Sequence, residues 1–169
     1  MLQTKEAFNE INMNSHPYIE QLITNCKIAQ EAIPESEYEI SSIEELHKMD
    51  DIRKGIYVIE ELGGNQEKTF QEFSDFKDRK VRACAKLNEP SKFLYVGSST
   101  TGIKKRLLQH LDEGPEGTYA LHMGHWFQGK FKVKIMTYNV ELPVLQIIED
   151  SISFNLKPAF GKQGGNNRF

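Results

Sequence analysis

A single carboxylate in a predicted helix is the most informative residue for chemistry in this chain. Glu149 falls on the apolar face of a helix that the sequence predicts over residues 144–156, among Leu145, Ile152 and Leu156. A carboxylate on a core-facing stripe costs free energy unless a cation, a metal or hydrogen-bond donors meet it. Two interpretations therefore stay open: a buried structural ion pair, or a ligand that binds Mg²⁺ together with water and substrate phosphate.

A basic pair stands on a second predicted helix, which begins near Gly102. Arg106 and His110 are four residues apart, beside a stripe formed by Ile103, Leu107 and Leu111. This spacing puts both side chains on one face, at the boundary between core and surface. A guanidinium there could bind phosphate and an imidazole could relay a proton, although two solvated polar residues would give the same pattern.

Two tyrosines lie on predicted strands that end or begin at glycine. The segment 55–59 is apolar on both alternating faces, as a central buried strand should be, and it carries Tyr57. The segment 93–96 carries Tyr95 and ends at Gly97. Strand tyrosines usually fill cores, so these two residues alone carry little functional information.

The elements that must position these residues follow one another in a simple order. A third strand over residues 131–136 alternates apolar with basic residues, and the order from residue 55 onward is strand, helical insert, strand, two helices, strand, helix. We expect an α/β (α+β) fold with a small mixed or antiparallel three-stranded sheet flanked by helices.

The sequence divides into three parts. Residues 1–54 are predicted to form a helical N-terminal extension, with one helix from Pro17 that ends before Pro34. A second short helix is predicted after a capping box formed by Ser42 and Glu45. The main domain spans residues 55–162, and residues 163–169 are glycine- and asparagine-rich and predict a flexible tail.

The charge of the chain is unevenly distributed. The net charge is −3, but residues 1–54 carry 5 basic against 11 acidic residues and residues 55–169 carry 16 against 13, so the two parts are at −6 and +3. The insert of about residues 63–90, predicted to be helical from Thr69 to Leu87, holds the densest basic cluster. The candidates for phosphate contact are Lys77, Arg79, Lys80, Arg82, Lys104, Lys105, Lys132 and Lys134.

Composition excludes several classes of protein. No window approaches 18 consecutive apolar residues, so no membrane-spanning segment is expected, and the N-terminus lacks the pattern of a secretion signal. Cys26 and Cys84 are too few for a disulfide framework or a cysteine zinc site. We therefore predict a cytoplasmic protein.

Taken together, these residues resemble the GIY-YIG nuclease superfamily. Residues 55–57 read Gly-Ile-Tyr and residues 95–97 read Tyr-Val-Gly, with valine in place of isoleucine. Arg106 and His110 match the family's R-x-x-x-H helix, and Glu149 stands on a later helix that follows a strand. The resemblance covers about residues 55–162, and the five elements occur in the family's order.

The resemblance implies hydrolysis of phosphodiester bonds in double-stranded DNA with Mg²⁺ or Mn²⁺ as the cofactor. Glu149 would hold the metal, and Arg106 would offset negative charge on the phosphoryl oxygens. Tyr57 would accept the proton of the attacking water, with His110 relaying that proton or orienting the water. Tyr95 would line the same cleft.

Two features depart from the family pattern. Tyr57 and Tyr95 are 38 positions apart, which is longer than the usual connection, and the basic insert fills this interval. The family places an asparagine shortly after a proline downstream of the glutamate, whereas Pro158 is followed by Ala-Phe and then Gly161.

A small nuclease without a separate DNA-binding domain looks most like the type II restriction endonucleases of this superfamily, and such an enzyme would work as a homodimer. Two other interpretations stay open: a non-catalytic DNA-binding module that keeps the fold, and a small-molecule-binding α/β protein. Binding without cleavage would distinguish the first, and the absence of salt-dependent DNA affinity would distinguish the second.

Overall fold

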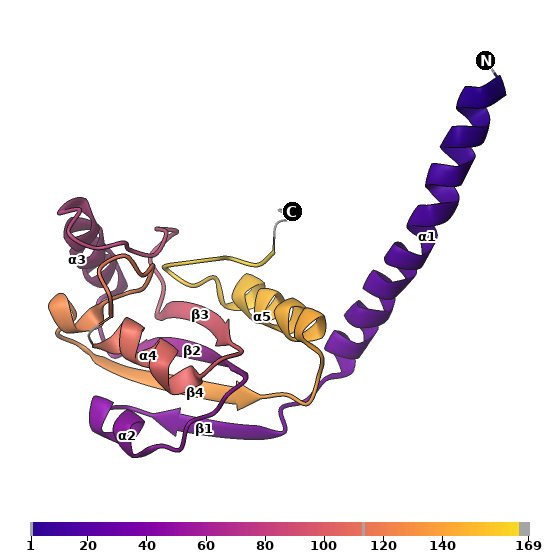
Figure 1. Cartoon of the computed structure of the whole chain (residues 1–169). Helices are drawn as coiled ribbons and strands as arrows, with labels where there is room; N and C mark the ends of the chain where they lie inside the picture. Colours follow the sequence, from indigo (N-terminus) through magenta and orange to yellow (C-terminus); the bar gives the residue numbers. More distant parts are fainter. Residues whose placement is uncertain (1, 113, 166–169) are drawn as a thin grey trace.

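The computed structural model describes residues 2–112 and 114–165, and Figure 1 shows the arrangement of its elements. In chain order these are α1 (Leu2–Glu31), β1 (Ser36–Ile40), α2 (Ile43–Lys48), β2 (Gly55–Leu62), α3 (Gln66–Asp78), β3 (Phe93–Ser99), α4 (Ile103–Leu111), a short 3₁₀ helix (Met123–His125), β4 (Lys130–Thr137) and α5 (Leu142–Leu156). None of these helices is both long enough and apolar enough to span a membrane.

The sheet has four strands in the order β1-β4-β2-β3, and every neighbouring pair is antiparallel. The mixed helix-and-strand class is confirmed, but the prediction of three strands is wrong. The additional strand is β1, which lies in the part predicted to be helical throughout. Its residues alternate too weakly to be recognised, because only Ile40 is buried in this edge strand.

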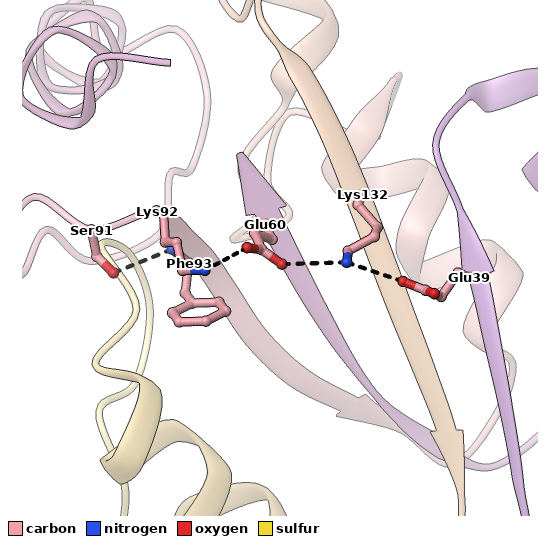
Figure 2. A network of polar contacts seen from close by, with 6 residues as sticks. All are labelled: Glu39, Glu60, Ser91, Lys92, Phe93 and Lys132. Atoms are coloured by element: carbon pink, nitrogen blue, oxygen red, sulfur yellow. Dashed lines mark hydrogen bonds and ion pairs between the residues drawn. The ribbon is translucent and has the colours of Figure 1, made fainter. Parts of the chain in front are cut away.

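Strand β1 neutralises the basic face of its neighbour β4. Lys132 lies 3.1 Å from Glu39 and Lys134 lies 3.0 Å from Glu37. Lys132 also approaches Glu60 on β2, at 3.8 Å, and Figure 2 shows how this chain of charges runs across the sheet. The acidic first part of the sequence and its more basic remainder therefore meet partly within the sheet.

The sheet separates two apolar cores. One contains Tyr57, Ile59 and Ile135 and is covered by α2, α3 and α4, and the other contains Val58 and Val96 and is covered by α5. Helix α1 packs on the second core only near its C-terminal end. Figure 1 shows the rest of this helix extending away from the sheet and the other helices.

Helix α1 begins well before the predicted start at Pro17, which lies inside it. A proline interrupts one backbone hydrogen bond, and the flanking turns continue the helix here. The N-cap of α2 at Ser42 is confirmed, because Ser42 Oγ accepts a hydrogen bond from the Glu45 N–H at 3.1 Å. The Glu45 carboxylate accepts from the N–H of Ser41, whereas a full capping box requires that of Ser42.

The basic insert is only partly helical, and the predicted helix over Thr69–Leu87 is wrong in its second half. Helix α3 ends at Asp78, and Lys80 adopts a positive φ of 55°, which a continuing helix does not allow. Cys84 and Leu87 are instead placed by isolated β-bridges to Ala120 and Phe160. The second of the two helices predicted between the second and third strands is reduced to the single 3₁₀ turn.

The expected flexible tail lies mostly outside the described residues. Within the described part, the side chain of Gln163 donates a hydrogen bond to the Pro158 carbonyl, 3.3 Å away. This segment follows α5 and turns back toward β3.

Candidate active site

The pairing of β2 with β3 brings the two predicted tyrosines to one face of the sheet. Tyr57 lies opposite Gly97 and Ile59 lies opposite Tyr95, so the tyrosines are diagonal neighbours. Their rings are stacked with centroids 6.2 Å apart and planes 9° apart. A Cβ at position 97 would lie 2.6 Å from Tyr57 Oη and 2.8 Å from Tyr95 Cε1, so this arrangement requires glycine there.

Helix α4 places His110 between the two tyrosines. Its ring centroid is 5.6 Å from that of Tyr57 and 4.2 Å from that of Tyr95. We expected His110 at the boundary between core and surface, but it is fully buried, because the tyrosine side of the sheet lies directly under this helix face. Arg106, one turn earlier, does lie at the boundary.

The hydrogen bonds of His110 define its tautomer. The Leu121 backbone N–H donates to Nδ1 at 3.3 Å, so Nδ1 is an acceptor and a neutral ring carries its proton on Nε2. Nε2 lies 3.0 Å from Tyr57 Oη, and it therefore donates to that oxygen. Burial, with smaller contributions from Arg106 and His122, lowers the pKa of His110 well below its ordinary value and keeps the ring neutral.

Arg106 is held in place by its neighbours and faces both tyrosine hydroxyls. One guanidinium nitrogen donates to Gln109 at 2.7 Å, and another donates to the backbone carbonyl of Tyr119 at 2.9 Å. Burial raises the pKa of Tyr57 strongly, and the charge and hydrogen bond of Arg106 oppose this rise. Burial likewise raises the pKa of Tyr95, and Arg106 again opposes the rise. Arg106 thus stabilises negative charge on either phenol oxygen.

Glu149 lies on α5, which covers the other face of the sheet from the two tyrosines. It is only 7% exposed, and one carboxylate oxygen accepts a short hydrogen bond from Ser98 Oγ. Burial raises the pKa of Glu149, while the Ser98 hydrogen bond and the charge of Lys162 lower it. Glu149 does not form the buried ion pair that is one of the two interpretations of its position. None of the ion pairs within 4.0 Å among the described residues includes it.

Gly161 completes the wall of the site beside Tyr95. Its φ is +86°, and a Cβ there would lie 2.6 Å from Tyr95 Cε2. Both the backbone conformation and the close contact with the ring exclude a side chain. The glycine at the position where the resemblance expects asparagine therefore has a structural reason in this chain.

A groove of about 1100 Å³ opens beside these residues. Tyr95 and Gly161 lie in its wall, and Tyr119 stands at its edge with an exposed ring. Three lysines and two acidic residues also line it: Lys86, Lys157, Lys162, Glu89 and Asp150. The groove is therefore wide, its wall combines polar and apolar surface, and its charged residues are mixed with a cationic excess.

Most of the predicted phosphate-binding side chains form hydrogen bonds or ion pairs within the protein. Five of the eight make contacts within the protein: Lys77 with the Ala85 carbonyl, Arg82 with the Gly114 carbonyl, Lys104 with the His47 and Met49 carbonyls, and Lys132 and Lys134 with glutamates. Arg79, Lys80 and Lys105 are exposed. Lys157 and Lys162 are not among the residues predicted from sequence, because both follow the last helix, where no periodicity marks them.

The residues fit a sparse metal site. Among residues 2–112 and 114–165, no cluster of three or more His, Cys, Asp or Glu side chains could enclose a metal ion. A single buried carboxylate on a helix whose Gln146 and Asp150 line the groove suits instead a Mg²⁺ ion that takes its remaining ligands from water and substrate phosphate. Glu149 is the residue that meets this description.

No protein-family model matches the chain, and no curated protein or solved structure matches it either. The resemblance to the GIY-YIG nuclease superfamily therefore stays a prediction. The geometry of the site is an independent observation: Tyr57, Tyr95 and His110 contact one another, and Arg106 and Glu149 lie within electrostatic range of both tyrosines.

Proposed function

We propose that this protein is a Mg²⁺- or Mn²⁺-dependent DNA endonuclease of the GIY-YIG type, acting as a sequence-specific type II restriction endonuclease. The observation that carries the proposal is the cluster of two tyrosines, a neutral histidine and an arginine, with the buried Glu149 within electrostatic range of both tyrosines and Tyr95 lining the groove. The three lysines that line the groove favour a phosphodiester as the substrate.

The protein residues divide the chemistry of hydrolysis among them. Tyr57 accepts the proton of the attacking water, which requires its phenol to be ionised beforehand. The Nε2–H of His110 and the guanidinium of Arg106 stabilise that phenolate. Arg106 donates to the carbonyl of Tyr119, a residue that lines the groove, and its planar, permanently charged guanidinium would offset charge that develops on the phosphoryl oxygens. Tyr95 packs against His110 and keeps water away from its ring.

Glu149 would hold the divalent cation at the groove. When bound, that cation supplies Lewis-acid polarisation of the scissile phosphate and stabilisation of the leaving oxygen. Ser98 orients the Glu149 carboxylate through its hydrogen bond, and Lys162 keeps the pKa of that carboxylate from rising further. The ionised form needed for metal binding is therefore supported from two sides.

The test is cleavage of plasmid and defined duplex DNA by the purified full chain with Mg²⁺, with Mn²⁺ and with excess chelator. We expect discrete fragments that disappear with the chelator. Glu149→Gln keeps the shape of the side chain but removes its charge, and it should lower the cleavage rate at least about 100-fold. Glu141→Gln is a matched control, because Glu141 is an exposed glutamate at the N-cap of the same helix.

The results separate the alternatives. A smear of fragments would indicate a non-specific nuclease and would contradict the restriction assignment. Salt-dependent DNA binding with no cleavage by the wild-type chain would favour the non-catalytic DNA-binding module. Equal cleavage by Glu149→Gln and wild type would refute the role of this carboxylate.

We also propose that two copies of the chain act together through α1. Four apolar side chains on the part of this helix beyond the body are exposed: Tyr18, Ile19, Leu22 and Ile23. An antiparallel pairing of two α1 helices about an axis near Ile23 would bury them and set Glu20 against Lys27 of the partner subunit. Light scattering should report a dimer that Glu20→Lys weakens and that Glu20→Lys with Lys27→Glu restores; a monomer in every variant would refute the pairing.

A further inference from the structure

The segment after α5 places one lysine beside the candidate active site, and the inference drawn from it rests on the proposed nuclease function. Lys162 follows Gly161 directly and lines the groove that Tyr95 also lines. Its side chain is exposed, so it reaches solvent and any molecule bound in the groove.

The backbone around Lys162 is fixed rather than free. The Phe160 N–H donates to the Leu94 carbonyl at 3.1 Å, and the Gly161 N–H donates to the Lys86 carbonyl at 2.8 Å. On the other side, Ser153 Oγ of α5 donates to the Lys162 carbonyl at 2.5 Å. These bonds tie the segment to β3, to the insert and to α5, so the position of Lys162 is set by three separate parts of the fold.

The chain direction at this point is forced by Gly161. Because its Cα lies against the Tyr95 ring and its φ is +86°, no side chain can occupy that position. Lys162 is therefore the first residue after the Gly161–Tyr95 contact that carries a side chain, and it lines the groove.

The electrostatic surroundings indicate what Lys162 meets there. Ser153, one turn after Glu149 on α5, donates to the Lys162 carbonyl, and the charge of Lys162 lowers the pKa of Glu149. The ion pairs within 4.0 Å in the described part of the chain are formed by other lysines, which leaves this ammonium without a close carboxylate. A cation held near, but not bound to, a candidate metal ligand is suited to bind an anion that the metal also binds.

We propose that Lys162 is a further catalytic residue, whose ammonium binds a non-bridging oxygen of the scissile phosphate beside Glu149. Lys162, from the segment after α5, would then add to the positive charge that Arg106 supplies from α4 beside Tyr119. The ammonium forms no covalent bond and transfers no proton; it lowers the free energy of the more highly charged pentavalent state relative to bound substrate.

The experiment compares Lys162→Ala and Lys162→Arg with wild type on a cleavable duplex. Single-turnover rates are measured at saturating enzyme with Mg²⁺, and DNA affinity is measured with Ca²⁺ in place of Mg²⁺. We expect Lys162→Ala to lower the saturating rate about 30- to 300-fold while Kd changes less than about fivefold, and Lys162→Arg to recover part of the rate. Lys130→Ala, an exposed lysine at the start of β4, is the matched control and should change neither quantity.

A pH profile separates direct contact from a purely indirect role. If Lys162 acted only by lowering the pKa of Glu149, the rate of Lys162→Ala would recover to the wild-type value at higher pH, where Glu149 is ionised in any case. Direct binding of phosphate predicts the same fold-loss over about pH 6 to 9. Recovery at high pH, an unchanged saturating rate, or a loss confined to Kd would each overturn the proposal.

The failure of this inference is distinguishable from the failure of the proposed function. A wild-type chain that cleaves while Lys162→Ala cleaves equally well overturns the inference alone. A wild-type chain that binds DNA without cleaving it overturns the nuclease function and the inference together.

Discussion

Replacing Gly161 with alanine should both unfold the protein more easily and disturb the tyrosine pair. The added Cβ meets two obstacles, a φ of +86° and a distance of 2.6 Å to Tyr95 Cε2. A side chain at positive φ costs about 1–2 kcal/mol, and forcing a methyl group into a packed contact costs about 1–3 kcal/mol. We therefore expect Gly161→Ala to lower the free energy of unfolding by about 3 kcal/mol.

Two other glycines separate these contributions. Gly63 has a φ of +68° and nothing within 4 Å of its Cβ position, so Gly63→Ala carries the backbone cost alone, about 1 kcal/mol. Gly97 lacks a positive φ, but its Cβ would lie 2.6 Å from Tyr57 Oη, so Gly97→Ala carries the packing cost alone, about 1–3 kcal/mol.

The assay is urea unfolding followed by circular dichroism, with thermal unfolding as a second measurement. For a chain of this length each kcal/mol corresponds to a fall in Tm of about 2–4 °C, so Gly161→Ala should melt about 6–12 °C below wild type. If Gly161→Ala is no less stable than Gly63→Ala, the close packing of this segment on Tyr95 is refuted. Gly161→Asn should be destabilised as much as Gly161→Ala and should not gain activity.

Three further predictions concern protonation and charge. Because burial raises the pKa of Tyr57, its phenolate is scarce at neutral pH, so the single-turnover cleavage rate should rise close to tenfold per pH unit between about pH 6 and 8; a flat profile would exclude Tyr57 as the base. The pKa of Glu149 is raised in the folded state, so the folded protein binds this proton more tightly than the unfolded chain does. The wild-type protein therefore loses stability as the pH rises above the ordinary pKa range of glutamate. Glu149→Gln should unfold at a higher urea concentration than wild type at pH 7, and the difference should shrink toward pH 4. The ion pairs of Lys132 and Lys134 with β1 predict that replacing either lysine with alanine leaves the salt dependence of DNA binding unchanged, and a shallower salt dependence would show that they contact phosphate.

The strand pair that carries the tyrosines could be predicted from sequence because its signals are local. Apolar residues on both faces of 55–59 and a glycine after Val96 are properties of short windows, and the structure confirms both strands. Their partnership in one sheet followed from the order of elements. The stacking of Tyr57 on Tyr95 did not follow, because it depends on the diagonal register and on the space that Gly97 leaves.

The remaining parts of the site depend on contacts between distant residues. Periodicity placed His110 at the edge of a helix face, and only the sheet beneath it determines that the ring is fully buried. Strand β1 escaped prediction because Glu37 and Glu39 look like a solvated segment until their lysine partners on β4 are known. Lys162 lies in irregular backbone, where its position is set by hydrogen bonds from other parts of the chain.

The free edge of β3 is covered by residues that follow α5. Ala159 and Phe160 donate backbone hydrogen bonds to the Phe93 and Leu94 carbonyls, at 2.8 and 3.1 Å, so this stretch occupies a strand edge that would otherwise be open to pairing. During synthesis, Tyr57 and Tyr95 leave the ribosome long before this stretch and before Glu149. A nascent chain can therefore build most of the sheet while its groove still lacks a wall and its metal ligand. Under the proposed function, this order of assembly delays DNA cleavage until the whole domain has folded, which protects the DNA of the cell that makes it.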